Sequence, residues 1–125
     1  MIRGDAPVIH GFHAHVYYDE HTFTQAAALC QAAHQRFDVP MGRLHRRPVG
    51  PHPCWSCQLS ISTEQFQEVL LWLMQARNGL SVFIHGLSGD DLRDHTELVM
   101  WLGRSYPLDL SLFGSPADAS RSSRS

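Results

Sequence analysis

The chain has 125 residues, enough for one domain with one hydrophobic core. Hydrophobic residues make up 43% of it and charged residues 18%, a globular composition that excludes general disorder. The formal net charge is −2, there is no basic run, and the apolar stretches are too short to span a bilayer, so we expect neither nucleic acid nor membrane as a partner.

The cysteines and the N-terminus indicate the compartment. The first residues lack the apolar core of a secretory signal, and three cysteines do not make a disulfide framework. Cys54 and Cys57 match a C-x-x-C pattern, but on a strand this odd spacing sends the two sulfurs to opposite faces. We therefore expect ordinary reduced thiols and a cytoplasmic protein.

The first predicted element is a strand over residues 10–18, where side chains alternate between two faces. The apolar face carries Phe12, Ala14 and Val16, and the other face carries His13, His15 and Tyr17. Such a strand packs its apolar half on a core and leaves its imidazoles on an open face.

The next elements complete a known order. A helix is expected over residues 22–37, strands over 39–47 and 54–61, a helix from 62 to the Asn-Gly stop at 78–79, and a strand over 80–85. This β-α-β-β-α-β order predicts an α+β, ferredoxin-like fold, with two helices on one face of an antiparallel sheet.

The C-terminal part is predicted to add a helix over about residues 92–103 and a short strand over 106–113. Residues 114–125 are small, polar and without pattern, so we expect a disordered tail there. Residues 1–113 are then a single ferredoxin-like domain.

Three of the nine histidines are expected to form one cluster. His13 and His15 leave the same strand face about 6–7 Å apart, a spacing that can hold one metal ion between two imidazoles. In a ferredoxin-like sheet the first strand lies beside the last and antiparallel to it, which places His85 near His13.

Two further histidines are harder to place. His52 enters its strand from the opposite end, nearer Tyr17, and joins the cluster only if the proline-rich loop curls over the open face or a symmetry mate supplies it. His95 begins the third helix, where it either folds under the sheet or packs on an apolar stripe. The remaining histidines, at positions 10, 21, 34 and 45, have no partner at chelating spacing.

Other interpretations stay open from the residues alone. Asp90 or Asp94 could complete a metal site, although capping of a helix explains them as well. The same histidines suit a non-catalytic metal- or ligand-binding dimer, or a cofactor-free oxygenase that uses them only as bases.

Several short phrases, in order, resemble the small DOPA 4,5-dioxygenase family of bacteria and fungi, and the resemblance runs from about residue 9 to residue 113. The matching phrases are GFHAHVYY at 11–18, VGPHP at 49–53, CQ at 57–58, RNGLSVFIH at 77–85, DHT at 94–96 and WLG at 101–103. One departure is Gly86, where the family pattern has proline.

The resemblance implies extradiol cleavage of a catechol such as L-DOPA by O₂ at non-haem Fe(II), in a ferredoxin-like homodimer. It assigns the metal first to His13, His15 and His85, with His52 a close fourth. His95 and whichever histidine does not bind metal, His52 foremost, would be the acid/base groups, and Tyr17 would hydrogen-bond an oxygen intermediate.

Overall fold

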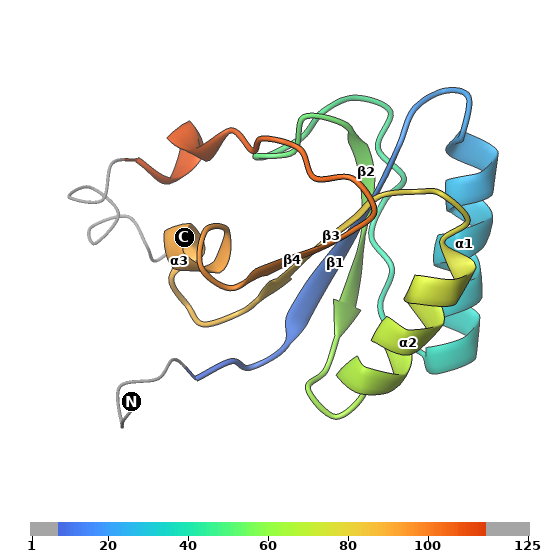
Figure 1. The fold of residues 1–125 in the computed structure, drawn as a ribbon, viewed down its shortest axis with the longest axis horizontal. Coiled ribbons are helices and arrows are strands. Elements are labelled where there is room, and N and C mark those ends of the chain that lie inside the picture. Colours follow the sequence, from blue (N-terminus) through green and yellow to red (C-terminus); the bar gives the residue numbers. More distant parts are fainter. Residues whose placement is uncertain (1–7, 115–125) are drawn as a thin grey trace.

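The computed structural model describes residues 8–114, which form a four-stranded antiparallel sheet with strand order β2-β1-β3-β4 and helices packed around it (Figure 1). The elements are β1 (Phe12–Tyr18), α1 (Phe23–Phe37), β2 (Trp55–Ile61), α2 (Phe66–Ala76), β3 (Val82–Gly86), α3 (Asp91–Asp94), β4 (Val99–Leu102) and the 3₁₀ helix η1 (Leu110–Phe113). Among the described residues, no helix is long and apolar enough to cross a membrane. Apart from Gly114, the predicted disordered tail lies outside the described residues.

The predicted α+β architecture is confirmed. Helices α1 and α2 lie side by side on one face of the antiparallel sheet, and α3 and the chain after β4 lie on the other (Figure 1). The apolar half of β1 faces the helices, where Ala14 and Val16 are fully buried. They pack in one core with residues of both helices, including Cys30 and Leu73. Each large apolar side chain buried there contributes about 1.5–3 kcal/mol.

Helix α2 ends where the sequence predicts. Asn78 and Gly79 have φ angles of 48° and 86°, in the left-handed region that asparagine and glycine tolerate best. The chain then turns directly into β3. This strand runs antiparallel to β1 in the middle of the sheet.

The strand predicted over residues 39–47 is wrong. The segment runs along β2 with backbone hydrogen bonds from Ser60 N to the Pro40 carbonyl (3.0 Å) and from Gly42 N to the Gln58 carbonyl (2.8 Å), but only Met41 and Leu59 form a bridge. Pro40 has no N–H to donate to a ladder, so the edge is covered without a regular strand.

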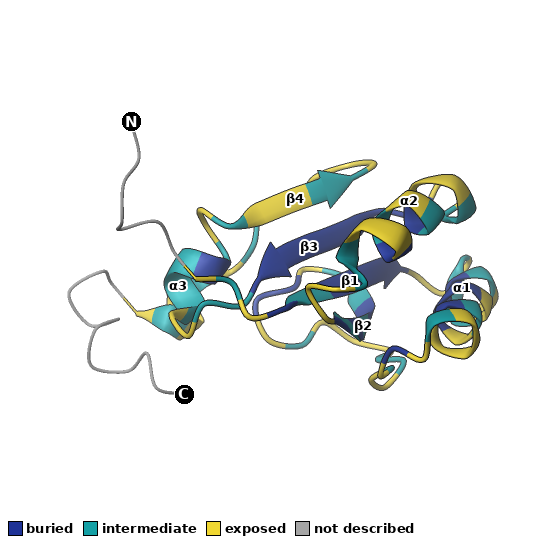
Figure 2. Cartoon of the chain, turned by 90° about the horizontal axis from the view of Figure 1, so that it is seen from below, coloured by how far each residue is buried: buried dark blue, intermediate teal, exposed yellow. Residues whose placement is uncertain are grey.

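The helix predicted over residues 92–103 is also wrong. Helix α3 ends at Asp94, and β4 pairs with β3 in the same range. Val99 and Trp101 stand opposite His85 and Phe83, so they share the open face with them. Figure 2 shows the buried β3 beside the more exposed β4, which forms the edge of the sheet. The apolar residues that fit a helical stripe fit this short strand equally well.

The strand predicted over residues 106–113 is not present. The segment does not pair with the free side of β4, the edge strand, and Pro107 lacks a donor for a ladder. The segment instead passes over the open side and ends in η1, capped by Asp109 through a hydrogen bond from Ser111 N at 3.1 Å. Asp109 N also donates to the Pro51 carbonyl at 2.9 Å, which joins this segment to the loop that carries His52.

Candidate metal centre

The open face of the sheet brings three imidazoles together. His13 and His15 leave the same side of β1, and His85 of β3 stands directly opposite His13 in the antiparallel register. Each of the three offers one ligand nitrogen, and these atoms all lie within 4.8 Å of one another. The predicted position of His85 beside His13 is thus confirmed, whereas the ligand role of the three residues stays a prediction.

The closest pair is His15 and His85, whose Nε2 atoms lie 3.1 Å apart. His85 Nδ1 donates to the Gly86 carbonyl at 3.0 Å, so the lone pair of neutral His85 is on Nε2 and faces His15. Two nitrogens that bind one ion at about 2.1 Å and near a right angle are separated by about 3 Å. The separation therefore suits two adjacent ligands of one ion, and the Gly86 carbonyl is the partner that orients His85.

His13 is the most exposed member of the group. Its ring meets those of His15 and His85 edge-on, with centroids 5.9 Å and 5.3 Å away. The Gln58 side chain of β2 lies 3.4 Å from its Nε2. Gln58 pairs with His15 across the strands, so its place beside the cluster follows from the register rather than from any local pattern.

Burial keeps these imidazoles neutral. Desolvation lowers the pKa of His85 to about 3 and that of His52 to about 4, with nearby histidines adding to the effect. Desolvation likewise holds the pKa of His15 well below its usual value, reinforced first by His52, and lowers the pKa of His13. Neutral imidazole is the form that binds a metal, so near neutral pH the donor set is ready for a divalent ion.

His52 reaches the site because its loop does curl over the open face. Its ring lies 4.1 Å from that of His15, and its Nδ1 is 2.8 Å from the Tyr17 hydroxyl. The group of three ligand atoms within 4.8 Å does not include His52. Its hydrogen bond to Tyr17 and its place beside the His15 ring suit proton transfer better than a fourth ligand position.

His95 lies on the other side of the cluster. It follows α3, its Nδ1 donates to the Asp91 carbonyl at 2.7 Å, and its ring lies 4.2 Å from that of His85. The turn around α3 therefore does fold under the sheet. With the proton on Nδ1, neutral His95 has its free lone pair on Nε2.

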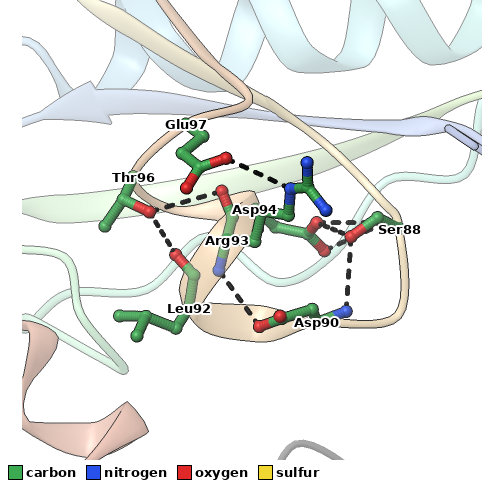
Figure 3. A network of polar contacts seen from close by, with 7 residues as sticks. All are labelled: Ser88, Asp90, Leu92, Arg93, Asp94, Thr96 and Glu97. Carbon is green, nitrogen blue, oxygen red and sulfur yellow. Dashed lines mark hydrogen bonds and ion pairs between the residues drawn. The ribbon is translucent and has the colours of Figure 1, made fainter. Parts of the chain in front are cut away.

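The carboxylates in the turn around α3 form hydrogen bonds that hold the turn itself (Figure 3). Asp94 is 2% exposed and accepts from the Ser88 backbone N–H at 3.0 Å and from the Ser88 hydroxyl. Asp90 caps α3 by accepting from Arg93 N at 3.1 Å. Neither belongs to the ligand group, so the donor set found among residues 8–114 consists of histidines alone.

Aromatic side chains line the site next to the imidazoles. Phe83 is fully buried, with its ring 5.8 Å from His15 and 4.6 Å from Trp101. Tyr17 packs against Trp101 and Tyr106, and burial raises the pKa of its hydroxyl, which stays protonated. These rings exclude water from one side of the cluster and offer flat surfaces for a planar ligand. The alternation of β3 could have placed Phe83 on this face, whereas placing Trp101 required the unpredicted β4.

The comparisons agree with the sequence resemblance. A model of the Dopa 4,5-dioxygenase family matches residues 12–112. The chain is 33% identical over 109 residues to the DOPA 4,5-dioxygenase of Amanita muscaria, which covers 80% of this chain and 48% of that protein. It is 32% identical over 120 residues to an uncharacterized 21.2 kDa protein of Botryotinia fuckeliana, covering 86% and 66%. The chain thus spans about half to two thirds of the length of these relatives.

A solved structure has the same fold. The crystal structure of a Nostoc punctiforme protein, described as a candidate dioxygenase, superposes with a TM-score of 0.82 and 38% identity. The match covers 84% of this chain and 91% of that protein.

Proposed function

The chain belongs to the Dopa 4,5-dioxygenase family, and from this premise we propose that it is an extradiol ring-cleaving dioxygenase. Its substrates would be O₂ and a catechol such as L-DOPA, and its metal would be non-haem Fe(II). The observation that carries the proposal is the convergence of three imidazole ligand atoms within 4.8 Å at the open face of the sheet.

The residues present suit such an ion. His13, His15 and His85 would hold it as three neutral ligands, which leaves coordination positions free for both catechol oxygens and for O₂. When bound, Fe(II) would hold the catechol next to O₂ and pass electrons from the catechol to O₂, with no net change in its own oxidation state. The protein then has to orient the catechol, keep bulk water away and move protons.

Two histidines beside the ligand set can accept and donate the protons that the reaction moves. A catechol that binds through both oxygens gives up hydroxyl protons, and a neutral imidazole can accept one. His52, hydrogen-bonded to Tyr17, and His95, with its Nε2 lone pair free, stand on opposite sides of the ligand pair His15 and His85. We assign them as the acid/base pair, with Tyr17 donating a hydrogen bond to an oxygen of the reacting group.

The experiment is a substrate screen with Fe(II)-reconstituted protein. L-DOPA, caffeate, protocatechuate and 4-methylcatechol are added without oxygen, O₂ is then admitted, and the visible absorbance of a ring-opened product is followed with O₂ uptake. We expect one O₂ consumed per catechol, and loss of turnover in His15→Ala. His21→Ala, at an exposed histidine remote from the cluster, is the matched control.

The alternatives make different predictions. A non-catalytic metal-binding protein binds Fe(II) stoichiometrically and yields no product from any of the four catechols. A cofactor-free oxygenase keeps its turnover in the presence of a chelator. Either outcome contradicts the dioxygenase proposal.

The proposal extends to a cytoplasmic homodimer. All three cysteines are free, which is consistent with a reducing compartment. The edge strand β4 has Val99 and Met100 37% and 39% exposed, an apolar edge of the kind that a second subunit covers. A monomeric mass by light scattering at micromolar concentration would contradict the dimer.

A further inference from the structure

One segment contacts Tyr17 and the surroundings of His52 and His95, the two histidines to which we assign proton transfer. Residues 106–113, here named the strap, follow β4 and cross the open side of the sheet (Figure 1). The ring of Tyr106 lies 5.5 Å from that of Tyr17, Asp109 N donates to the carbonyl of Pro51 next to His52, and the ring of Phe113 lies 4.6 Å from that of His95.

The contact with His95 is the most specific of the three. Within residues 8–114, the hydrogen bond found for the His95 ring is the one from Nδ1 to the Asp91 carbonyl. A single bond at one edge fixes the position of that nitrogen but not the tilt of the ring, which depends on the rings packed against the imidazole, that of His85 at 4.2 Å among them. Phe113 stacks on the imidazole with an interplanar angle of 29°, which restricts the tilt.

We propose that Phe113 is a positioning residue that holds the His95 imidazole in one orientation beside the three-histidine group, with its Nδ1 on the Asp91 carbonyl. The catalytic value of this orientation rests on the proposed function, whereas the orientation itself does not. Phe113 acts through His95, and we assign it no contact with metal or substrate.

The packing of Phe113 supports this role. It is half-buried, yet it is not among the residues of the core that the sheet forms with α1 and α2. Its neighbour Leu112 is 57% exposed in the same 3₁₀ turn. The turn is held by Asp109, which accepts from both the backbone N–H and the hydroxyl of Ser111. The strap thus presents Phe113 to His95 and Leu112 to solvent.

The test uses Phe113→Ala, the conservative Phe113→Tyr and the matched control Leu112→Ala, all in the full chain. The first measurement is the long-range ¹H–¹⁵N spectrum of the imidazoles in metal-free protein. We expect His95 in the wild type to give the pattern of one tautomer, with the proton on Nδ1. Phe113→Ala should shift it toward an average of two tautomers, whereas Phe113→Tyr and Leu112→Ala should leave it unchanged.

The second measurement distinguishes a change in the orientation of His95 from a general loss of structure at the site. Affinity for Co²⁺, measured by competition with a chelator, should stay within about twofold in Phe113→Ala. With the turnover assay, kcat for the preferred catechol should fall about 10-fold or more while KM changes little, as expected when a proton-transfer group is misaligned. Phe113→Tyr should restore kcat.

Three results would overturn the inference: an unchanged His95 spectrum in Phe113→Ala, an equal effect of Leu112→Ala, or a loss of Co²⁺ affinity in step with kcat. The spectrum and the metal affinity need no turnover. If the wild type opens no catechol, the proposed function fails, and the His95 spectrum still decides whether Phe113 orients this ring.

Discussion

His15 and His85 are 70 residues apart in the chain, yet their Nε2 atoms are separated by 3.1 Å, a hydrogen-bond distance that requires one of the two nitrogens to carry a proton. His85 donates its Nδ1 proton to the Gly86 carbonyl, so His15 is the donor in this contact. An ion bound between the two nitrogens replaces that proton, and His15 must then carry its proton on Nδ1. The pair is therefore a hydrogen bond in the metal-free protein, and under the proposed function the two nitrogens would become adjacent ligands of one ion.

The first prediction is that His85→Ala removes Fe(II) binding. Loss of one of three imidazoles also leaves His15 without its partner, and we expect at least about 100-fold weaker binding, since removal of an outer-shell partner alone costs 10–100-fold. Anaerobic competition with a chelator measures the affinity. His34→Ala, at a histidine outside the cluster whose Nδ1 is hydrogen-bonded to the Val39 carbonyl, is the control for the loss of an imidazole. Equal affinities in His85→Ala and wild type would rule out the assigned ligand.

The second prediction concerns stability and pH in the metal-free protein. The unfolded-state pKa of histidine is near 6.5, whereas the folded-state values are about 4 for His52 and about 3 for His85. Between these limits the unfolded chain binds more protons than the folded one. The contribution of these imidazoles to the free energy of unfolding is therefore fully present above pH 6.5 and falls as the pH drops toward 4. Each imidazole that stays neutral contributes a slope of about 1.4 kcal/mol per pH unit.

Urea denaturation of metal-free protein from pH 7.5 to pH 4.5 measures this slope. His52→Asn should flatten it by removing one of the groups, and His21→Asn, which is exposed, should not. A free energy of unfolding that is constant over this range would contradict the neutral, buried cluster.

The third prediction separates His52 from the metal ligands. Tyr17→Phe removes the hydroxyl that is 2.8 Å from His52 Nδ1 but keeps the ring packed on Trp101 and Tyr106. We expect kcat to fall about 10-fold in Tyr17→Phe and about 100-fold or more in His52→Ala, as for loss of a general acid or base. Fe(II) affinity should be unchanged in both variants. A large loss of affinity in His52→Ala would instead make His52 a fourth ligand.

The positions of three site histidines could be predicted from the sequence, because they depend on strand alternation and on the strand pairing of the predicted fold. The alternation of β1 placed His13 and His15 on one face, and the antiparallel pairing of the first and last strands of the predicted fold placed His85 beside them. The positions of His52 and His95 depended on the paths of two loops. No periodicity encodes a loop path, so both residues could be named from the sequence but not placed.

The errors after residue 86 have one physical origin. Val99–Leu102 was assigned to a helix because its apolar residues continue a helical spacing that begins at Leu92. Its pairing with β3 supplies backbone hydrogen bonds that a local pattern does not report. After β4 the chain does not pair with the outer edge of the sheet but returns across the open face, which is how Phe113 comes to lie on His95.

The last prediction tests whether the acidic turn is structural. Asp94 accepts from the Ser88 backbone N–H and hydroxyl, and it is nearly fully buried. Asp94→Asn replaces one acceptor oxygen by a donor that faces donors, so the free energy of unfolding should fall by about 1–3 kcal/mol. Because Asp94 lies outside the three-histidine group, the Fe(II) affinity of the folded protein should stay within about threefold.

Asp90→Ala is the comparison within the same turn. It removes only the cap of α3, at the exposed residue bonded to Arg93 N, and should cost about 1 kcal/mol. Thermal unfolding and metal competition on the two variants give both quantities. If Asp94→Asn loses metal binding at unchanged stability, a carboxylate completes the site after all, and the all-histidine donor set is wrong. If instead stability falls and the metal stays bound, Asp94 serves the metal centre only by holding the turn from which His95 reaches His85.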